Sequence, residues 1–214
     1  MGVEVWAIVV AAGQGRRFGQ PKQFALLCGR PVIEWSLEAS RSVARGVVAV
    51  VPESFLRSPG IGMGADRVIA GGPTRASSVR RGLAAVPESA DVLVVHDAAR
   101  PLASRELFRA VVEAVVAGAD GAVPGLAVAD TVKRVHSGRV VETLDRNELV
   151  AVQTPQAFRA EALRRAHALA PEATDDASLL EALGLNVVVV PGEYHNLKLT
   201  SPDDLATAEK WSNR

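Results

Sequence analysis

The hydrophobic pattern along the chain alternates between two kinds of segment. Continuous apolar runs rich in β-branched residues predict strands buried on both faces, at Val5–Ala12, Val47–Val51, Val92–His96 and Asn186–Val190. Helix-like stretches lie between them, at Val32–Ser42, Arg75–Ala85, Ser104–Ala117 and Ala160–Ala170. Strands that alternate with helices favour an α/β fold with a Rossmann-like, mostly parallel sheet flanked by helices and joined by right-handed crossovers.

Local signals mark the ends of several helices. Ser104 is placed to cap the third helix, and Gly118 follows its end, where glycine commonly stops a helix. Ser201-Pro202-Asp203-Asp204 predicts the start of a C-terminal helix, with a serine cap, a proline and then acids favoured by the helix dipole. Thr174-Asp175 similarly precedes a predicted helix at Asp176–Leu183.

One region breaks the alternation. Thr131–His136 and Arg139–Thr143 are rich in β-branched residues around Ser137-Gly138, a pattern typical of a β-hairpin. Because charged residues are mixed with valines here, the hairpin suits a protruding arm, at about 127–150, better than the core. We therefore expect one domain over residues 1–214, with an arm that contacts another subunit.

Composition and charge narrow the class of protein. The 214 residues are 48% hydrophobic and 22% charged, which fits an α/β domain with a sizeable core. Lys+Arg and Asp+Glu both number 24, and this zero net charge argues against a nucleic-acid or membrane partner. The single cysteine, Cys28, excludes an internal disulfide. The first apolar run is shorter than the roughly 20 residues that span a bilayer, so we expect a cytoplasmic protein.

The segment after the first predicted strand, Ala11–Lys22, carries the clearest chemistry. Ligands bind open α/β sheets beyond the carboxyl ends of the strands. Glycines in this loop let backbone N–H groups turn toward phosphate oxygens, and Arg16, Arg17 and Lys22 add positive charge. The spacing fits neither a Walker loop nor the dinucleotide fingerprint, because no hydroxyl follows the lysine and the third glycine is Gly19. The loop therefore predicts a polyphosphate site of another kind.

Further motifs follow in order along the chain. They are Gly71-Gly72 through Ser78-Val79, HDAARP at 96–101, DTVK at 130–133, DRN at 145–147, TPQ at 154–156 and NLKLT at 196–200. The loop resembles the signature of the sugar-phosphate nucleotidyltransferases. The ordered set resembles, from end to end, the 2-C-methyl-D-erythritol 4-phosphate cytidylyltransferase family of non-mevalonate isoprenoid biosynthesis. That resemblance implies an enzyme that transfers CMP from CTP to 2-C-methyl-D-erythritol 4-phosphate, giving 4-diphosphocytidyl-2-C-methyl-D-erythritol and pyrophosphate.

The resemblance also implies roles for individual residues. The expected catalytic residues are Arg17 and Lys22, at the α-phosphoryl group and leaving pyrophosphate, and Lys198, at the attacking phosphate. The expected nucleotide contacts are Ala11, Ala12, Gly13, Gly15, Gly72, Ser78 and Asp97, and the expected acceptor contacts are Asp97, Thr131, Arg146, Thr174 and Lys198. Asp97, an acid at a strand end, would also hold Mg²⁺. In the family the arm crosses a two-fold homodimer and brings Thr131 and Arg146 to the partner's acceptor site.

The residues themselves leave alternatives open. Apart from the resemblance, Asp97 could merely cap a turn, and a lone lysine such as Lys198 is usually surface. Pro73 departs from the family pattern, in which some relatives carry an acid, and proline has no N–H to offer the base. Alternative functions are a cytidylyltransferase for another polyol phosphate, such as ribitol 5-phosphate, and a non-catalytic nucleotide-binding dimer.

Overall fold

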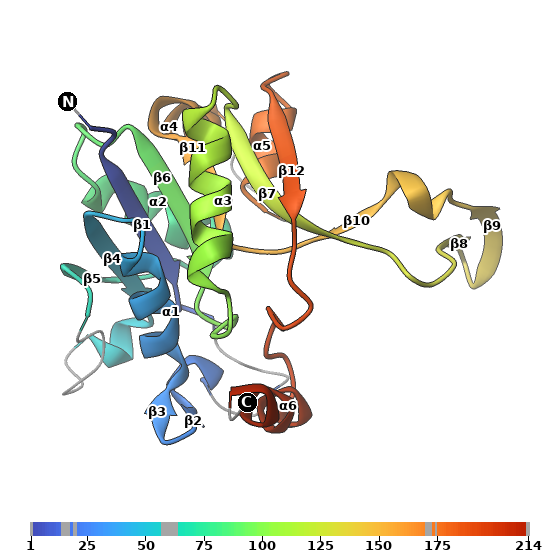
Figure 1. The fold of residues 1–214 in the computed structure, drawn as a ribbon, viewed down its shortest axis with the longest axis horizontal. Helices are drawn as coiled ribbons and strands as arrows, with labels where there is room; N and C mark the ends of the chain where they lie inside the picture. Colours follow the sequence, from blue (N-terminus) through green and yellow to red (C-terminus); the bar gives the residue numbers. More distant parts are fainter. Residues whose placement is uncertain are drawn as a thin grey trace.

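The computed structural model describes residues 2–13, 18, 21–56, 64–169, 173 and 175–212. Within these ranges an eight-stranded sheet has the order β10-β7-β11-β6-β1-β4-β5, with β12 also paired to β7 (Figure 1). The strands are β1 (Val5–Val10), β4 (Gly46–Val51), β5 (Arg67–Ala70), β6 (Val92–Asp97), β7 (Gly121–Ala127), β10 (Val150–Val152), β11 (Gln156–Arg159) and β12 (Val187–Pro191). β11 runs antiparallel to β6 and β7, and β10 antiparallel to β7, while the remaining pairs are parallel. The predicted mostly parallel sheet is confirmed.

Helices cover both faces of this sheet. One face carries α1 (Val32–Arg41) and α3 (Arg105–Val116), and the other carries α2 (Arg75–Ala85), α4 (Ala160–Leu169) and α5 (Ala177–Glu181). Short pieces complete the chain: η1 (Lys22–Phe24), β2 (Leu26–Leu27), β3 (Arg30–Pro31), η2 (Glu53–Phe55) and η3 (Arg146–Glu148). Among the described residues, no helix has both the length and the apolar composition needed to cross a membrane.

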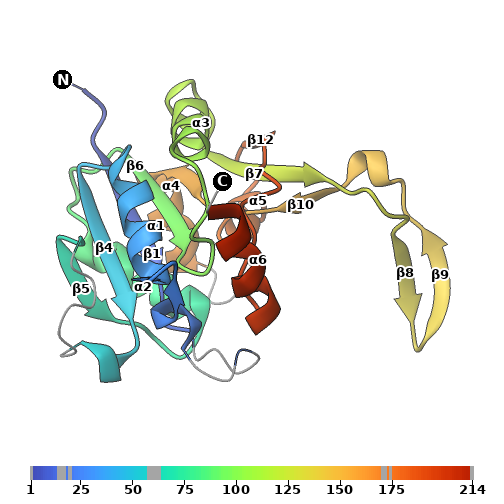
Figure 2. The same ribbon diagram turned by 60° about the horizontal axis from the view of Figure 1, so that its bottom comes forward.

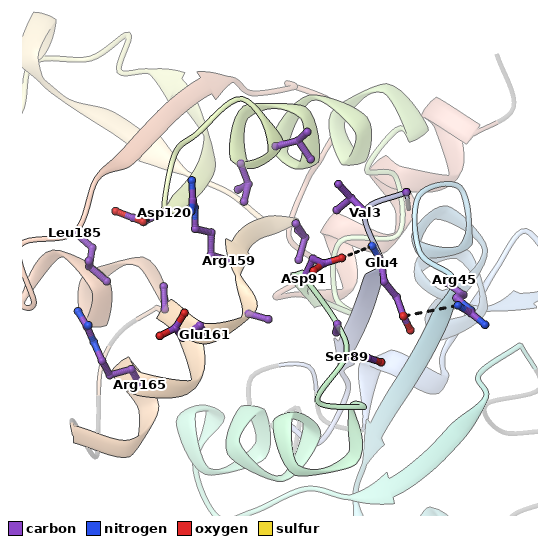
Figure 3. Close-up of a pocket in the computed structure, with 17 residues that line it drawn as sticks. Val3, Glu4, Arg45, Ser89, Asp91, Asp120, Arg159, Glu161, Arg165 and Leu185 are labelled. Atoms are coloured by element: carbon purple, nitrogen blue, oxygen red, sulfur yellow. Dashed lines mark hydrogen bonds and ion pairs between the residues drawn. The ribbon is translucent and has the colours of Figure 1, made fainter.

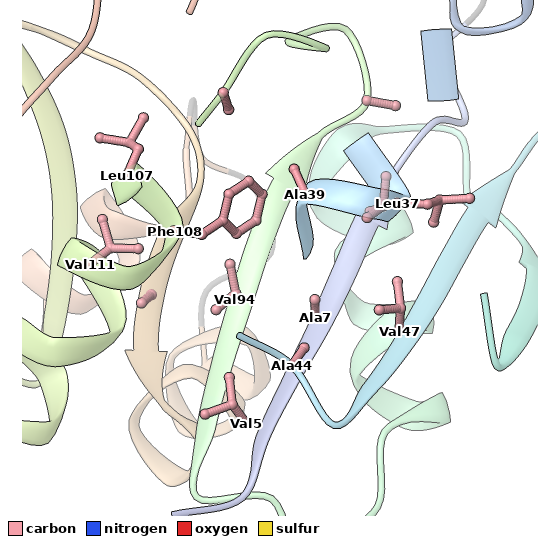
Figure 4. Packing of buried hydrophobic residues seen from close by; sticks show 14 of the residues in the cluster. Val5, Ala7, Leu37, Ala39, Ala44, Val47, Val94, Leu107, Phe108 and Val111 are labelled. Carbon is pink, nitrogen blue, oxygen red and sulfur yellow. The ribbon is translucent and has the colours of Figure 1, made fainter. Parts of the chain in front are cut away.

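The core explains why the predicted strands read as continuous apolar runs. Side chains alternate across a strand, so Ala7 of β1 packs toward α1 and α3 while Ile8 packs toward α2 and α4. Figure 4 shows the first of these layers, where Phe108 of α3 lies between Val94 of β6 and Ala39 of α1. Because both faces are buried, apolar side chains occupy both register positions along β1.

The predicted helix ends agree with the structure at several points. The Ser104 hydroxyl accepts the Leu107 N–H at 3.0 Å, and Gly118 has a φ of 124° just after α3. At the C-terminus, α6 (Pro202–Ser212) begins after Ser201, whose hydroxyl accepts the Asp204 N–H. The helix expected at Asp176–Leu183 is shorter than predicted, since α5 covers only Ala177–Glu181.

The hairpin of β8 (Lys133–His136) and β9 (Arg139–Thr143) stands away from the sheet, beyond β7 and β10 (Figures 1 and 2). Ser137 and Gly138 have φ values of 47° and 77°, the left-handed pair that matches the twist of a two-residue hairpin. Every residue of both strands is exposed. The predicted protruding hairpin is therefore confirmed.

Candidate functional site

A pocket of about 260 Å³ lies at the carboxyl ends of β1 and β6. The loop after β5 and the first turn of α2 form part of its wall, as does the segment before α6. Parallel strands end together at this edge, where open α/β sheets bind their ligands. The pocket brings together predicted site residues from distant parts of the chain: Ala11, Ala12, Gly13, Lys22, Gly72, Ser78, Asp97 and Lys198.

Asp97 is the acidic centre of this pocket. Its Oδ1 accepts a hydrogen bond from Arg75 Nε at 3.1 Å, and its Oδ2 accepts one from Lys198 Nζ at 2.6 Å. Burial alone would raise the pKa of this carboxyl, but the charges and hydrogen bonds of Arg75 and Lys198 outweigh it and hold the pKa well below its usual range. Asp97 is therefore ionised at neutral pH.

Arg75, the first residue of α2, is a site residue that the sequence analysis missed. Besides Asp97 it binds Asp176, with 2.8 Å between Nη1 and Oδ2. Burial alone would lower the pKa of Arg75, and the two carboxylates raise it above its usual value. A helix N-terminus disfavours a cation, so an arginine at this position signals acidic partners that the sequence does not locate.

Two lysines bring positive charge to the pocket from opposite ends of the chain. Lys22 Nζ, in η1, donates to the Leu199 carbonyl at 2.5 Å. The Leu199 N–H in turn donates to the Ala99 carbonyl at 2.8 Å, which ties the segment that carries Lys198 to the loop after β6. The two ammonium groups thus belong to one connected structure beside Asp97, and together they suit a phosphate ligand.

The loop that leaves β1 is shaped by a buried glutamine. Gln23 Nε2 donates to the carbonyls of Ala11 and Gly13, at 2.6 and 3.0 Å. These bonds give partners to two loop carbonyls, one of them on the buried residue Ala11, and fix the start of the predicted phosphate loop. Sequence reasoning did not single out Gln23. Arg17 and Gly15, two of the predicted site residues, lie outside the described residues.

Two of the predicted nucleotide contacts, Gly72 and Ser78, lie in the turn before α2 and at the start of α2. A Cβ built on Gly71 would lie 2.1 Å from the Ala12 Cβ, so glycine is required for this turn to pack on the end of β1. The Gly72 N–H donates to the Ser78 hydroxyl at 3.1 Å, and that hydroxyl lies 2.9 Å from the Thr74 carbonyl. Ser78 is almost fully buried, and it shapes the turn as well as lining the pocket.

Buried polar groups hold the end of β6 in place. Complete burial lowers the pKa of His96 to about 4, so the ring is neutral. Its Nε2 lies 3.2 Å from the Arg100 carbonyl, a pure acceptor, so Nε2 carries the proton and Nδ1 accepts from the Thr154 hydroxyl. The same hydroxyl accepts the Asp97 N–H at 3.0 Å. This chain of bonds fixes the backbone that presents Asp97.

Two predicted acceptor contacts of the arm do not line this pocket. Thr131 and Arg146 are exposed at the arm, where Arg146 donates to the Ala129 carbonyl. Thr174 lies outside the described residues. In the described part of the chain, no three His, Cys, Asp or Glu side chains gather as a metal-binding group. Among the described residues, Asp97 is therefore the acidic side chain that lines the pocket of a single chain.

Comparison with known proteins agrees with this geometry. Residues 5–214 match the model of the 2-C-methyl-D-erythritol 4-phosphate cytidylyltransferase (IspD) family. The enzyme of that name from Rubrobacter xylanophilus is 46% identical, over 95% of this chain and 92% of the relative. The one from Aquifex aeolicus is 42% identical, over 95% of each chain. The crystal structure of the Thermus thermophilus enzyme superposes with a TM-score of 0.83 at 38% identity, over all of both chains. The chain belongs to the 2-C-methyl-D-erythritol 4-phosphate cytidylyltransferase family.

Proposed function

We propose that this protein transfers CMP from CTP to 2-C-methyl-D-erythritol 4-phosphate, releasing pyrophosphate, in non-mevalonate isoprenoid biosynthesis. The observation that carries the proposal is one pocket lined by Lys22, Lys198 and the ionised Asp97 carboxylate, with Lys198 in direct contact with Asp97. Family membership gives the substrates their identity. Because charged metabolites such as CTP do not cross membranes freely, we place the reaction in the cytoplasm.

The nucleophile needs little help from the protein. A phosphate monoester has a second pKa near 6, so the acceptor phosphate is already an anion at neutral pH and attacks the α-phosphorus without a general base. The obstacle is charge, because two anions approach each other and more negative charge develops as the bond to pyrophosphate breaks. Positioned cations lower that barrier.

The lysines take different parts of this task. Lys22, together with Arg17, acts on the α-phosphoryl group and the leaving pyrophosphate. Lys198 binds the incoming phosphate, and in this proposal it exchanges its 2.6 Å contact with Asp97 for a phosphate oxygen. Its side chain is 43% exposed, so it has room to make that exchange. Backbone groups of Ala11–Gly13 and the turn at Gly72 hold the nucleotide.

Asp97 is suited to hold Mg²⁺. Its carboxylate lines the pocket, is ionised and keeps free lone pairs, because a carboxylate offers about four acceptor positions and two are in use. Mg²⁺ in proteins commonly takes one or two carboxylates, with phosphate oxygens and water completing its shell. When bound, the cation supplies positive charge against the phosphates.

A homodimer would complete the acceptor side. We infer that the arm crosses to a second copy, where Thr131 and Arg146 join the partner's Thr174 and Lys198. Inactive Lys198→Ala and Arg146→Ala chains, mixed under exchange conditions, then form heterodimers with one intact site, and activity returns. Proven heterodimers without recovered activity would sink the shared site.

The reaction itself is tested by pyrophosphate release across the four ribonucleoside triphosphates, each with methylerythritol phosphate, ribitol 5-phosphate or no acceptor. We expect release with CTP plus methylerythritol phosphate. Faster release with ribitol 5-phosphate would assign another polyol phosphate. Nucleotide binding without release under any condition would point to a non-catalytic dimer.

A further inference from the structure

Arg75 joins two carboxylates that come from different parts of the fold. Its Nε binds Asp97 at the end of β6, and its Nη1 binds Asp176 just before α5. The Asp176 side chain is 1% exposed and that of Asp97 is 11% exposed. A guanidinium presents its donors in a rigid plane, so the position of one carboxylate sets the position of the other.

Asp176 is itself held from the far side. His167 of α4 lies with Nε2 2.9 Å from Asp176 Oδ1, while Arg75 occupies Oδ2. Both oxygens of Asp176 are thus engaged, and the carboxylate cannot turn without breaking a buried contact. The chain of contacts runs from His167 through Asp176 and Arg75 to Asp97, at the wall of the pocket.

Stability alone does not account for this cluster. Replacing buried ion pairs by well-packed apolar residues is often neutral or stabilising, so such pairs are weak indicators of a stabilising role. Arg75 Nη2 is also buried, and it finds no hydrogen-bond partner among the described residues. A buried donor without a partner costs free energy, so the placement of this guanidinium is not the best one for stability alone. Its place beside Asp97 indicates a task at the site.

We propose that Arg75 is a positioning residue for the reaction: held by the His167–Asp176 pair, it keeps the Asp97 carboxylate turned toward the pocket. This inference rests on the proposed function, in which Lys198 leaves Asp97 for the acceptor phosphate. Among the described residues, Arg75 is then the cation that still holds Asp97 in place. It does not touch the substrate in this account, and acts through Asp97.

The test is a double-mutant cycle read by calorimetric titration of CTP, with and without Mg²⁺. In the wild type we expect Mg²⁺ to strengthen CTP binding. Arg75→Met should reduce that gain by roughly 10–100-fold, the usual cost of losing a residue that supports a metal ligand. Arg75→Lys should restore part of it. In an Asp97→Asn background, Arg75→Met should have no further effect, since the residue through which it acts is already altered.

Two further variants separate positioning from folding. Arg75→Met leaves two buried acids without their shared cation, and this can lower the Tm. The double variant Arg75→Met/Asp176→Asn removes one charge of each sign, and should recover Tm while the Mg²⁺-dependent gain stays lost. Arg164→Met is the matched control, because Arg164 donates to the carbonyls of Leu83 and Pro87 away from the pocket. It should keep the full gain.

Three results would overturn the proposal. The first is a full Mg²⁺-dependent gain in CTP affinity in Arg75→Met or in Arg75→Met/Asp176→Asn. The second is a loss of that gain from Arg75→Met that is equally large in the wild-type and Asp97→Asn backgrounds. The third is a wild type whose CTP affinity does not change with Mg²⁺. Failure of the proposed function is recognised separately. In that case the wild type would bind CTP with the expected Mg²⁺ dependence but release no pyrophosphate with methylerythritol phosphate.

Discussion

Two pockets lie at opposite edges of the same sheet, and they differ in size and in chemistry. The larger, about 1250 Å³, is at the amino ends of β1 and β6 (Figure 3). Two of its ion pairs are long and partly exposed: Glu4 with Arg45 at 3.7 Å, and Arg159 with Asp120 at 3.8 Å. The smaller, about 260 Å³, is at the carboxyl ends of those strands and contains Asp97.

The contacts between charged groups, more than the volume of the pocket, distinguish the carboxyl edge from the amino edge. The larger of two pockets is a common first hypothesis for a binding site, and here it lies at the edge away from Asp97. At the carboxyl edge the ion pairs are shorter and more buried: Lys198 lies 2.6 Å from Asp97, and Arg75 lies 2.8 Å from Asp176. Such contacts hold side chains in a fixed arrangement before a substrate arrives.

The largest expected effect comes from removing a cation at each edge. Lys22→Ala should lower kcat by roughly 10²–10³, the typical loss of one transition-state donor. Arg159→Ala, in the larger pocket, should leave kcat essentially unchanged. Steady-state pyrophosphate release measures both. A near-wild-type kcat for Lys22→Ala, or an equal loss for Arg159→Ala, would break the contrast between the two edges.

A methyl group added at each edge gives the next largest effect. Gly71→Ala places a Cβ 2.1 Å from the Ala12 Cβ, so the turn before α2 must shift. We expect the free energy of unfolding to fall by about 1–3 kcal/mol, as in other overpacked sites, and CTP binding to weaken with it. Gly2→Ala is the control, because nothing lies within 4 Å of its added Cβ. Urea unfolding that finds the two variants equally stable would contradict the packing argument.

The smallest effect concerns the segment that carries Lys198. Burial alone would raise the pKa of Asp204, but hydrogen bonds from Thr200 and Ser201 lower it to about 2. A lowered folded pKa adds stability above the ordinary value of 3.8, and that stability is lost as the pH falls toward 2. Discounted for solvent screening, Asp204→Asn should cost about 1 kcal/mol at neutral pH.

Urea unfolding at stepped pH checks this prediction. The difference between wild type and Asp204→Asn should shrink as the pH falls below 3.8. A difference in the free energy of unfolding that stays constant with pH would mean that the substitution does not act through the lost charge.

The fold could be predicted from the sequence where the apolar pattern is strong. The runs that form β1, β4, β6 and β12 were predicted, but the strands β5, β7, β10 and β11 were not. β7 reads Gly-Ala-Val-Pro-Gly-Leu-Ala, and its glycines and Pro124 argue against a strand. The other three have only three or four residues, too few for a pattern. These segments are strands because they pair with neighbouring strands in the sheet.

The site divides in the same way. Asp97, Lys22 and Lys198 stand in motifs of the family, and the structure brings all three to one pocket. Arg75 and Gln23 were missed because their importance lies in their partners, which the linear sequence does not reveal. Arg75 lies 101 residues from Asp176. The available signal was the unfavourable place of a cation at a helix N-terminus.

We propose that the carboxyl-edge pocket joins the CMP of CTP to a polyol phosphate. The most direct test is ³¹P NMR of the protein with CTP, Mg²⁺ and methylerythritol phosphate. We expect the acceptor's phosphomonoester signal to be replaced by a pair of diphosphate-diester signals, with one pyrophosphate for each acceptor consumed. An unchanged acceptor signal beside CMP and pyrophosphate, or beside intact CTP, would contradict it.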